Sequence, residues 1–167
     1  MVNRQSFFDT PIGTLTLIAS DDGVSRVLFD GQTPGQVGLA DDLPVIDNDP
    51  VLLVAEAQIH EYFAGDRKDF DLPLDLHGTE FQVEAWRSLA SVPYGETTSY
   101  GEQAERIGRP GAFRAVGAAN GKNPVPIILP CHRIVGANGS LTGFAGGLEL
   151  KQWLLSMEQT QQSFPGV

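Results

Sequence analysis

Three prolines occupy the seven-residue run PVPIILP at 124–130, which directly precedes Cys131, the only cysteine of the 167-residue chain. Proline fixes the backbone φ angle and removes an amide donor, so this run is expected to be rigid and extended rather than helical. The chain holds eleven prolines and nineteen glycines, which indicates many turns and argues against a coiled coil or a bundle of long helices. Hydrophobic residues make up 41% of the chain, enough for the core of one unit or of two small lobes.

A single cysteine also limits the chemistry of the chain. It cannot form an internal disulfide or a cysteine-rich zinc site, so we expect no metal, no cofactor and a free thiol in a reducing cytoplasm. The N-terminal stretch MVNRQSFFDTPIG lacks the basic start and apolar core of a signal peptide. No apolar segment approaches the roughly 20 residues that a membrane span needs, so no membrane association is expected.

The net charge of −10 is distributed unevenly along the chain. Residues 1–98 carry five basic and 17 acidic side chains, whereas residues 99–147 carry five basic and two acidic ones. Cys131 therefore lies in the only net basic block. An acidic chain with one basic face binds a polyanion there and repels it elsewhere, although ordinary surface variation also produces such blocks.

The first third of the chain has the pattern of β structure. In residues 10–20, Leu15, Leu17 and Ala19 alternate with polar residues, and the turn DDG leads into a second apolar run at 23–30. This arrangement predicts an antiparallel hairpin.

A loop and a helix are expected to complete the N-terminal lobe. The stretch 31–49 is rich in Gly, Pro and Asp and predicts a loop. Asp49 followed by Pro50 is typical of an N-cap and a first helical turn. The predicted helix runs from there to Gly65, with His60 on its solvated side.

The pattern changes near Gly78, which separates an N-terminal lobe, 1–78, from a C-terminal domain, 79–167. Thr79 and Gln82 form a capping-box pattern ahead of an amphipathic helical sequence. The C-terminal domain is therefore expected to begin with a helix.

Two short helices are predicted further along. Ser99 and Glu102 suggest a capping box for the first, which the Gly-Arg-Pro-Gly sequence at 108–111 ends, and AFRAVGAAN at 112–120 predicts the second. Two short helices joined by a glycine-containing turn outline a helix-turn-helix. The second helix is slim and carries one large cation, Arg114, so it suits close approach to a duplex, although its small residues equally suit helix packing.

The predicted fold class is therefore α+β. A small N-terminal antiparallel β-sheet lobe with a helix precedes a mostly helical C-terminal lobe that contains the helix-turn-helix.

The thiol needs an activating group. A free cysteine has a pKa of roughly 8.5, so Cys131 requires a base or a nearby positive charge to react as a thiolate. His132 is adjacent, but consecutive side chains of an extended chain point to opposite faces, so we expect a bridging water rather than direct contact. Leu150, Leu154 and Glu158 are spaced by four residues, which places Glu158 on an apolar helical face where a carboxylate needs a partner. We expect the chain Glu158–His132–water–Cys131, unless the helix frays and leaves Glu158 in solvent.

Residues 136–147, GANGSLTGFAGG, contain five glycines in twelve positions. They predict a mobile or tightly turned loop beside the thiol, which either lines a pocket with backbone groups or serves as a surface connector. A phosphate loop is excluded because no Lys-Ser/Thr pair follows.

These stretches closely resemble the O6-alkylguanine-DNA alkyltransferases, the suicide methyltransferases of DNA repair. The resemblance rests on RAVGAANGKNPVPIILPCHRIVGANGSLTGFAGGLELKQWLLSME at 114–158, PYGETTSYGEQA at 93–104 and FQVEAWRSLASV at 81–92. NPVPIILPCHRI is its most specific part, whereas the N-terminal lobe fits the family's ribonuclease H-like lobe by size and hairpin pattern only. The resemblance implies irreversible transfer of an alkyl group from O6-alkylguanine to Cys131, with O4-alkylthymine as a further candidate substrate.

The resemblance also implies roles for individual residues. Cys131 would be the alkyl acceptor, His132 the base that acts through a water, and Glu158 the carboxylate that orients His132. Asn123 would hold the turn before the cysteine, and Tyr100 would donate to guanine N3 and help rotate the nucleotide. The residues implied to contact DNA are Tyr100, Arg114 in the gap left by the flipped base, Ala115, Gly117 and Ala118.

The same resemblance outlines a substrate pocket and a partner. The implied pocket residues are Asn120, Ile134, Phe144, Ala145 and Gly146. Within it, the carbonyls of Cys131 and Ile134 would accept from the guanine amine, and the Ala145 N–H would meet the O6 atom. The implied partner is double-stranded DNA carrying O6-alkylguanine, bound by a protein that is monomeric in solution, with cooperative assembly on DNA as an option.

Two other functions are compatible with parts of the sequence. A non-enzymatic damage-binding module, similar to the alkyltransferase-like proteins, would bind the lesion without chemistry, but those proteins have tryptophan where this chain has Cys131. A thiol hydrolase acting on small molecules would not need the basic helix pair, so Arg114→Ala would leave its activity intact.

Overall fold

The computed structural model describes residues 3–163, with side chains described as far as Gln161. Contacts between residues divide the chain into two units, Met1–His77 and Gly78–Val167. Strands and helices occur in both units, so the α+β class is confirmed. In the described part of the chain, no helix has the length and apolar character that a membrane span requires.

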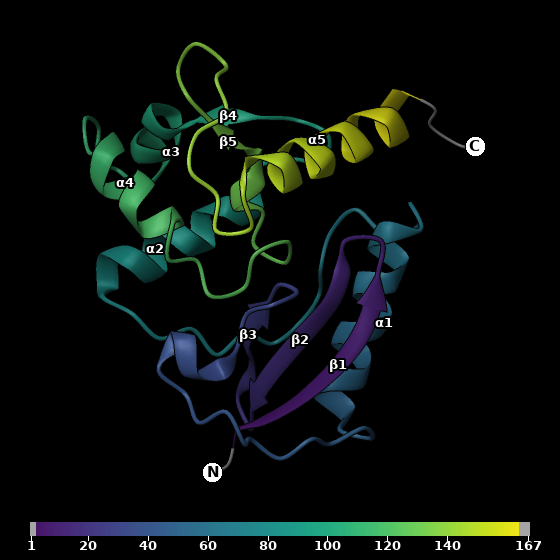
Figure 1. The fold of residues 1–167 in the computed structure, drawn as a ribbon. Helices are drawn as coiled ribbons and strands as arrows, with labels where there is room; N and C mark the ends of the chain where they lie inside the picture. Colours follow the sequence, from purple (N-terminus) through teal and green to yellow (C-terminus); the bar gives the residue numbers. More distant parts are fainter. Residues whose placement is uncertain (1–2, 164–167) are drawn as a thin grey trace. The chain divides into compact units, whose positions relative to one another are not determined.

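An antiparallel sheet and one long helix form the N-terminal unit (Figure 1). The sheet order is β1 (Arg4–Thr10), β2 (Gly13–Ser20) and β3 (Gly23–Leu28). Every residue of the central strand β2 from Leu15 to Ser20 is buried, the polar Thr16 and Ser20 included. Both faces of this strand are therefore covered. The predicted hairpin is confirmed.

The helix of this unit is α1, Pro50–Phe63. The Asp49 carboxylate accepts from the amides of Val51 and Leu52, which confirms it as the N-cap. His60 is exposed on this helix, as predicted. The predicted loop before it also contains a short 3-10 helix, η1 (Pro34–Val37), which the Gly/Pro-rich composition did not reveal.

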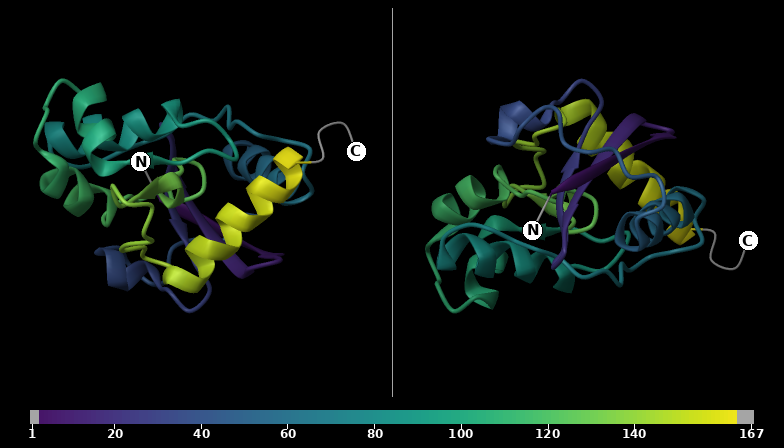
Figure 2. Two further views of the ribbon diagram at one scale, coloured as in Figure 1. Left: turned by 90° about the horizontal axis from the view of Figure 1, so that it is seen from above. Right: turned by 90° about the horizontal axis from the view of Figure 1, so that it is seen from below.

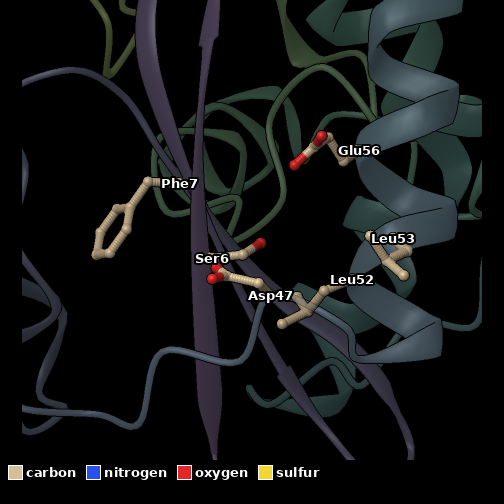
Figure 3. Close-up of a pocket in the computed structure, with 6 residues that line it drawn as sticks. All are labelled: Ser6, Phe7, Asp47, Leu52, Leu53 and Glu56. Atoms are coloured by element: carbon tan, nitrogen blue, oxygen red, sulfur yellow. The ribbon is translucent and has the colours of Figure 1, made fainter.

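A hollow lies between β1 and α1 (Figure 3). The Ser6 hydroxyl points toward α1, whereas the Phe7 ring points away from it. The lining residues are Ser6, Phe7, Asp47, Leu52, Leu53 and Glu56. None of them is a predicted site residue.

The C-terminal unit is mostly helical. Its elements are α2 (Glu80–Ser88), η2 (Leu89–Ser91), β4 (Thr98–Ser99), α3 (Tyr100–Arg106), α4 (Phe113–Asn120), η3 (Cys131–Arg133), β5 (Ile134–Val135) and α5 (Leu148–Ser163). The short strands β4 and β5 pair in parallel. Figures 1 and 2 show α5 set apart from α2, α3 and α4 within this unit.

Capping residues set where two of these helices begin. Thr79 and Gln82 form the predicted capping box of α2. The box predicted for α3 is only half formed: Ser99 Oγ accepts from the Glu102 amide, while the Glu102 carboxylate accepts from the Thr98 and Ser99 hydroxyls instead of the Ser99 amide. The helix nevertheless begins where predicted.

The predicted helix pair is formed by α3 and α4, which pack against each other and against α2. Gln103 and Asn120 exchange two side-chain hydrogen bonds of 2.7 and 3.1 Å between α3 and α4. The Trp86 indole of α2 donates to the Ala119 carbonyl at 2.7 Å. Buried polar contacts of this kind fix the angle between the helices, because each group would lose water without gaining a partner in another arrangement.

The proline-rich run is not extended, contrary to the prediction. The Leu129 amide donates to the Val125 carbonyl at 2.9 Å, and Ile127 adopts a positive φ of 75°. Prolines withhold amide donors from a sheet, and here the run folds back on itself instead. The Asn123 side chain closes the turn by donating to the Leu129 carbonyl at 2.8 Å and accepting from the Val125 amide at 3.0 Å.

The cysteine segment also differs from the prediction. Cys131–Arg133 is a single turn of 3-10 helix, η3, rather than extended chain. Successive side chains therefore fan out around the turn instead of alternating between two faces. This geometry directs three neighbouring side chains of different chemistry into one interior.

Candidate active site

Cys131 opens the 3-10 turn and is buried, with 8% of its surface exposed. The turn held by Asn123 leads directly into it, so the cysteine position follows from the fixed geometry of the preceding residues. Its thiol is free.

His132 and Glu158 form a fully buried pair. The distance from His132 Nε2 to Glu158 Oε2 is 2.6 Å, and both side chains are 0% exposed. Glu158 comes from α5, where Leu154 occupies the buried position one turn earlier. The helical stripe thus placed Glu158 correctly, and the alternative in which the carboxylate lies in solvent is wrong.

The pairing fixes the tautomer of His132. Because a carboxylate only accepts, Nε2 carries the proton and Nδ1 keeps its lone pair. Within residues 3–163, Nδ1 is buried and has no hydrogen-bond partner. The imidazole therefore has a free acceptor atom inside the protein, as a general base requires.

Arg133 is a site residue that the sequence reasoning missed. Its Nε and Nη2 donate to the two Glu158 oxygens at 2.9 and 3.1 Å, and its Nη1 donates to the Val92 carbonyl at 2.7 Å. Its guanidinium carbon lies 5.6 Å from the centre of the Tyr94 ring. The signal was available, because a carboxylate on an apolar stripe needs a cation, and Arg133 is the nearest one to the cysteine in the sequence.

These contacts set the charges of the pair. Burial alone would raise the pKa of Glu158, but hydrogen bonds from His132 and Arg133, together with their charges, lower it to about 2. Burial lowers the pKa of His132, and the positive charge of Arg133 acts in the same direction, although Glu158 opposes both. We conclude that Glu158 is ionised and His132 neutral at physiological pH, with Arg133 carrying the compensating charge.

The thiol itself is held in its neutral form. Burial raises the pKa of Cys131 to about 11, although the Asn123 amide and the charge of Lys151 lower it in part. At pH 7 only about one molecule in ten thousand then carries a thiolate. Reaction at this cysteine therefore depends on a base, which is the chemistry that the free Nδ1 of His132 offers.

Lys151 is a second residue that the sequence reasoning missed. Its side chain is fully buried, and Nζ donates to the carbonyls of Ile134 at 2.6 Å and Thr142 at 2.7 Å. A lysine seven residues before Glu158 in the sequence falls on the same helical face, so the stripe argument that found Glu158 also applied to it.

The predicted pocket residues lie in different surroundings. Ile134 is fully buried, and its carbonyl accepts from Lys151. Phe144 and Gly146 are half-buried in the glycine-rich loop, and Ala145 is exposed there. The Asn120 side chain is buried and exchanges hydrogen bonds with Gln103 between α3 and α4.

Four of the five predicted DNA-binding residues lie on α4, and the fifth, Tyr100, begins α3. Arg114, Ala115 and Ala118 are exposed, and the Arg114 guanidinium carbon lies 5.8 Å from the centre of the Phe113 ring. Gly117 is half-buried beneath Tyr100: a Cβ atom added to it would lie 3.6 Å from the ring. The slim helix thus presents one long cation between small side chains.

Tyr100 begins α3 and is half-buried. Its hydroxyl accepts a hydrogen bond from Thr142 Oγ1 at 2.9 Å, across from the helix to the glycine-rich loop. The loop is therefore tied to the helix pair as well as to α5. Among the described residues, no group of three or more His, Cys, Asp or Glu side chains is arranged to hold a metal ion.

Comparison with known proteins finds close relatives of this chain. The profile of the 6-O-methylguanine DNA methyltransferase DNA-binding domain matches residues 80–160, and that of the ribonuclease-like domain of the same enzymes matches residues 3–76. Curated relatives include the methylated-DNA–protein-cysteine methyltransferases of Mycolicibacterium paratuberculosis, 49% identical over 90% of this chain and 89% of that protein, and of Methanosarcina acetivorans, 44% identical over 92% and 96%.

Solved structures agree. Mycobacterium tuberculosis O6-methylguanine methyltransferase has a TM-score of 0.83 at 43% identity, with 95% of this chain and 94% of that chain covered. M. tuberculosis OGT in complex with DNA has a TM-score of 0.81 at 44% identity with the same coverage. The chain therefore belongs to the 6-O-methylguanine DNA methyltransferase family of DNA-repair enzymes.

Proposed function

We propose that this protein repairs DNA by direct reversal, moving the methyl or alkyl group of O6-alkylguanine in duplex DNA onto Cys131 in one irreversible step. The observation that carries the proposal is the buried Glu158–His132 pair, whose free Nδ1 belongs to the residue next to the only thiol. Because burial raises the pKa of the thiol, the thiol needs a base to remove its proton, and His132 is adjacent to it in the sequence.

The proposed reaction is a displacement at carbon. His132 Nδ1 takes the thiol proton through a water, and Glu158 stabilises the imidazolium that forms. The Cys131 sulfur then forms a bond to the alkyl carbon while the bond from that carbon to guanine O6 breaks. The electron pair of the broken bond leaves with the guanine as an anion, and the cysteine becomes a thioether. The guanine anion takes one proton from solvent, and the His132 imidazolium returns its proton to solvent. A thioether is a poor leaving group, so each chain reacts once.

The alkyl carbon is reachable only when the nucleotide leaves the stack, which costs a few kcal/mol. We propose that Arg114 fills the vacated space from the exposed face of α4, with Ala115, Gly117 and Ala118 allowing close approach. We propose that α4 enters the minor groove, whose degenerate hydrogen-bond code suits a protein that inspects any sequence. The basic charge of residues 99–147 would supply the attraction to phosphate.

We assign the remaining predicted residues to the base and to the turn. Tyr100 would donate to guanine N3, Asn123 would hold the cysteine in place, and Phe144 with Gly146 would wall the pocket. The carbonyls of Cys131 and Ile134 would accept from the guanine amine, and the Ala145 amide would meet O6. Asn120 would border the pocket from α4, with its side-chain amide paired to Gln103.

We further propose the arrangement in the cell. Residues 79–167 would form the DNA-binding and alkyl-acceptor domain and residues 1–78 a ribonuclease H-like lobe. The protein would act as a cytoplasmic monomer that is free to assemble cooperatively on DNA. O4-alkylthymine would be a second substrate.

The test is a titration of the protein with excess duplex containing a single O6-methylguanine, followed by quantification of the remaining lesion in the digested DNA. We expect loss of one lesion per chain and no further repair, with no loss for Cys131→Ser. Repeated turnover would point to a hydrolytic enzyme instead. Tight binding without any loss of lesion would point to a damage-recognition module.

A further inference from the structure

Lys151 has no part in the proposed reaction, yet its ammonium group is completely buried. Burying a charge is strongly unfavourable unless strong partners replace water. Both described partners of Nζ are main-chain carbonyls, those of Ile134 and Thr142, at 2.6 and 2.7 Å. These short bonds join the segment that follows the cysteine turn to the glycine-rich loop, so the lysine connects two parts of the site.

The first segment carries the acceptor. Ile134 follows the 3-10 turn of Cys131 and pairs with Thr98 in the two-strand parallel sheet. The second segment is the glycine-rich loop, 136–147. Its internal hydrogen bonds form one turn around Gly136 and Ser140 and another from Phe144 to Gly147, and Thr142 lies between the two turns.

Thr142 also extends the connection to the helix pair. While its carbonyl accepts from Lys151, its hydroxyl donates to the Tyr100 hydroxyl at 2.9 Å. A phenol that accepts in this way keeps its own proton available for another acceptor. Lys151, Thr142 and Tyr100 therefore form a continuous series of contacts from α5 to the start of α3.

We propose that Lys151 is a positioning residue that clasps the glycine-rich loop onto the acceptor segment and, through Thr142, orients the Tyr100 hydroxyl as a donor toward the substrate base. This inference rests on the proposed function, because the pocket and the Tyr100 contact belong to it. The five glycines give the loop little conformational preference of its own, so we expect the hydrogen bonds from Lys151 to determine its shape.

The test compares Lys151→Met with Gln152→Met, a change at the neighbouring exposed position of α5. Two readouts are needed. The first is the rate of amide hydrogen exchange across 136–147. The second is a ratio of two rates, methyl transfer to Cys131 from a saturating O6-methylguanine duplex divided by alkylation of Cys131 by iodoacetamide. The small electrophile needs no pocket, so the ratio removes any effect of the lysine charge on the thiol. For Lys151→Met we expect exchange in the loop to rise, and the ratio to fall, by about tenfold or more.

Wild-type exchange and a wild-type ratio in folded Lys151→Met would overturn the proposal. Hydrogen exchange needs no activity, so it still decides the clasp if the wild-type protein transfers no methyl group and the proposed function fails. If Lys151→Met does not fold, the exposed residue Thr142 supplies the second test. Thr142→Val should slow transfer several-fold, Thr142→Ser should restore it, and the loss should vanish in a Tyr100→Phe background. An equal loss in both backgrounds would contradict the inference.

Discussion

At the scale of single residues, Glu158 is the centre of the site. It accepts from the imidazole of His132, from two nitrogens of Arg133 and from the Gly95 amide, all within 3.2 Å. Four donors on one buried carboxylate satisfy nearly all of its acceptor capacity. The arrangement keeps a negative charge inside the protein and leaves the imidazole neutral, which is the state a base needs before it reacts.

Glu158→Gln tests this account of the carboxylate. The amide retains an acceptor for His132 but removes the charge that stabilises an imidazolium, so methyl transfer should slow by about a hundredfold or more. The buried Arg133 charge loses its partner, which should lower the free energy of unfolding by about 3–5 kcal/mol. Single-turnover rates and urea denaturation measure the two effects.

Two further variants control for general disruption. Glu149→Gln, at an exposed position of the same helix, should change stability by less than about 0.5 kcal/mol. The double variant Arg133→Met/Glu158→Gln should recover part of the lost stability without recovering transfer. A wild-type transfer rate in Glu158→Gln would show that the pair is structural only.

The residue scale also shows the limits of sequence reasoning. Glu158 was predictable because a carboxylate in an apolar stripe stands out against its neighbours. Arg133 and Lys151 were overlooked because long cationic side chains are usually solvated, although the need of Glu158 for a cation and the position of Lys151 on the same helical face pointed to them. Their roles depend on contacts with residues far away in the chain.

At the scale of elements, the turn before Cys131 places the thiol. Asn123 bridges its two ends, and Ile127 holds a positive φ that β-branched residues rarely adopt. Such a conformation persists only where the surrounding contacts enforce it. The turn therefore holds Cys131 in a fixed position.

Asn123→Ala removes both side-chain hydrogen bonds of this turn. We expect a loss of about 1–3 kcal/mol in the free energy of unfolding, because the Leu129 carbonyl and the Val125 amide lose their partner. Methyl transfer should slow more than iodoacetamide alkylation of Cys131. Asn48→Ala, at an exposed position, serves as the matched control. Unchanged stability and transfer in Asn123→Ala would contradict the role of the turn.

The exposed face of α4 gives the second prediction at this scale. Arg114→Ala should reduce transfer from duplex DNA by about a hundredfold. It should also weaken binding to the lesion-containing duplex, because the space left by the flipped nucleotide stays unfilled. Reaction of Cys131 with iodoacetamide should remain at the wild-type rate. Equal loss in both reactions would mean that Arg114 acts on the site rather than on DNA.

Element boundaries were largely predictable where a capping residue marks them, as at Asp49 and Thr79. The proline run was predicted incorrectly, because the rules for proline describe which hydrogen bonds are absent and not how the chain turns. The outcome depended on Asn123, whose side chain substitutes for the missing backbone donors. The 3-10 turn at Cys131 follows from that geometry and has no local signal of its own.

At the scale of the whole molecule, every residue assigned in the proposed function lies in the unit Gly78–Val167. The family assignment predicted from the motifs is confirmed, and so is the α+β class. The residue roles and the domain functions remain predictions. An overall charge of −10 with a basic block at 99–147 favours one orientation on a polyanion and weakens binding elsewhere.

The pH dependence of stability reports on the buried pair. The folded protein holds His132 at a pKa below its usual 6.5, so as pH falls below 6.5 the unfolded chain binds that proton first and stability decreases. Glu158 adds a further loss as pH falls from 4.5 toward about 2. Urea midpoints measured from neutral pH downward should fall for the wild type, and more gently for His132→Gln. An identical pH dependence in both proteins would contradict the buried neutral histidine.

The central claim is that Cys131 itself receives the alkyl group. The most direct measurement mixes the protein with one equivalent of a duplex containing a single O6-methylguanine, records the intact mass and maps the modified peptide. The account predicts a gain of one methylene unit per chain, located on Cys131 and absent in Cys131→Ser. An unchanged mass in the presence of bound lesion, or a gain located on another residue, would contradict it.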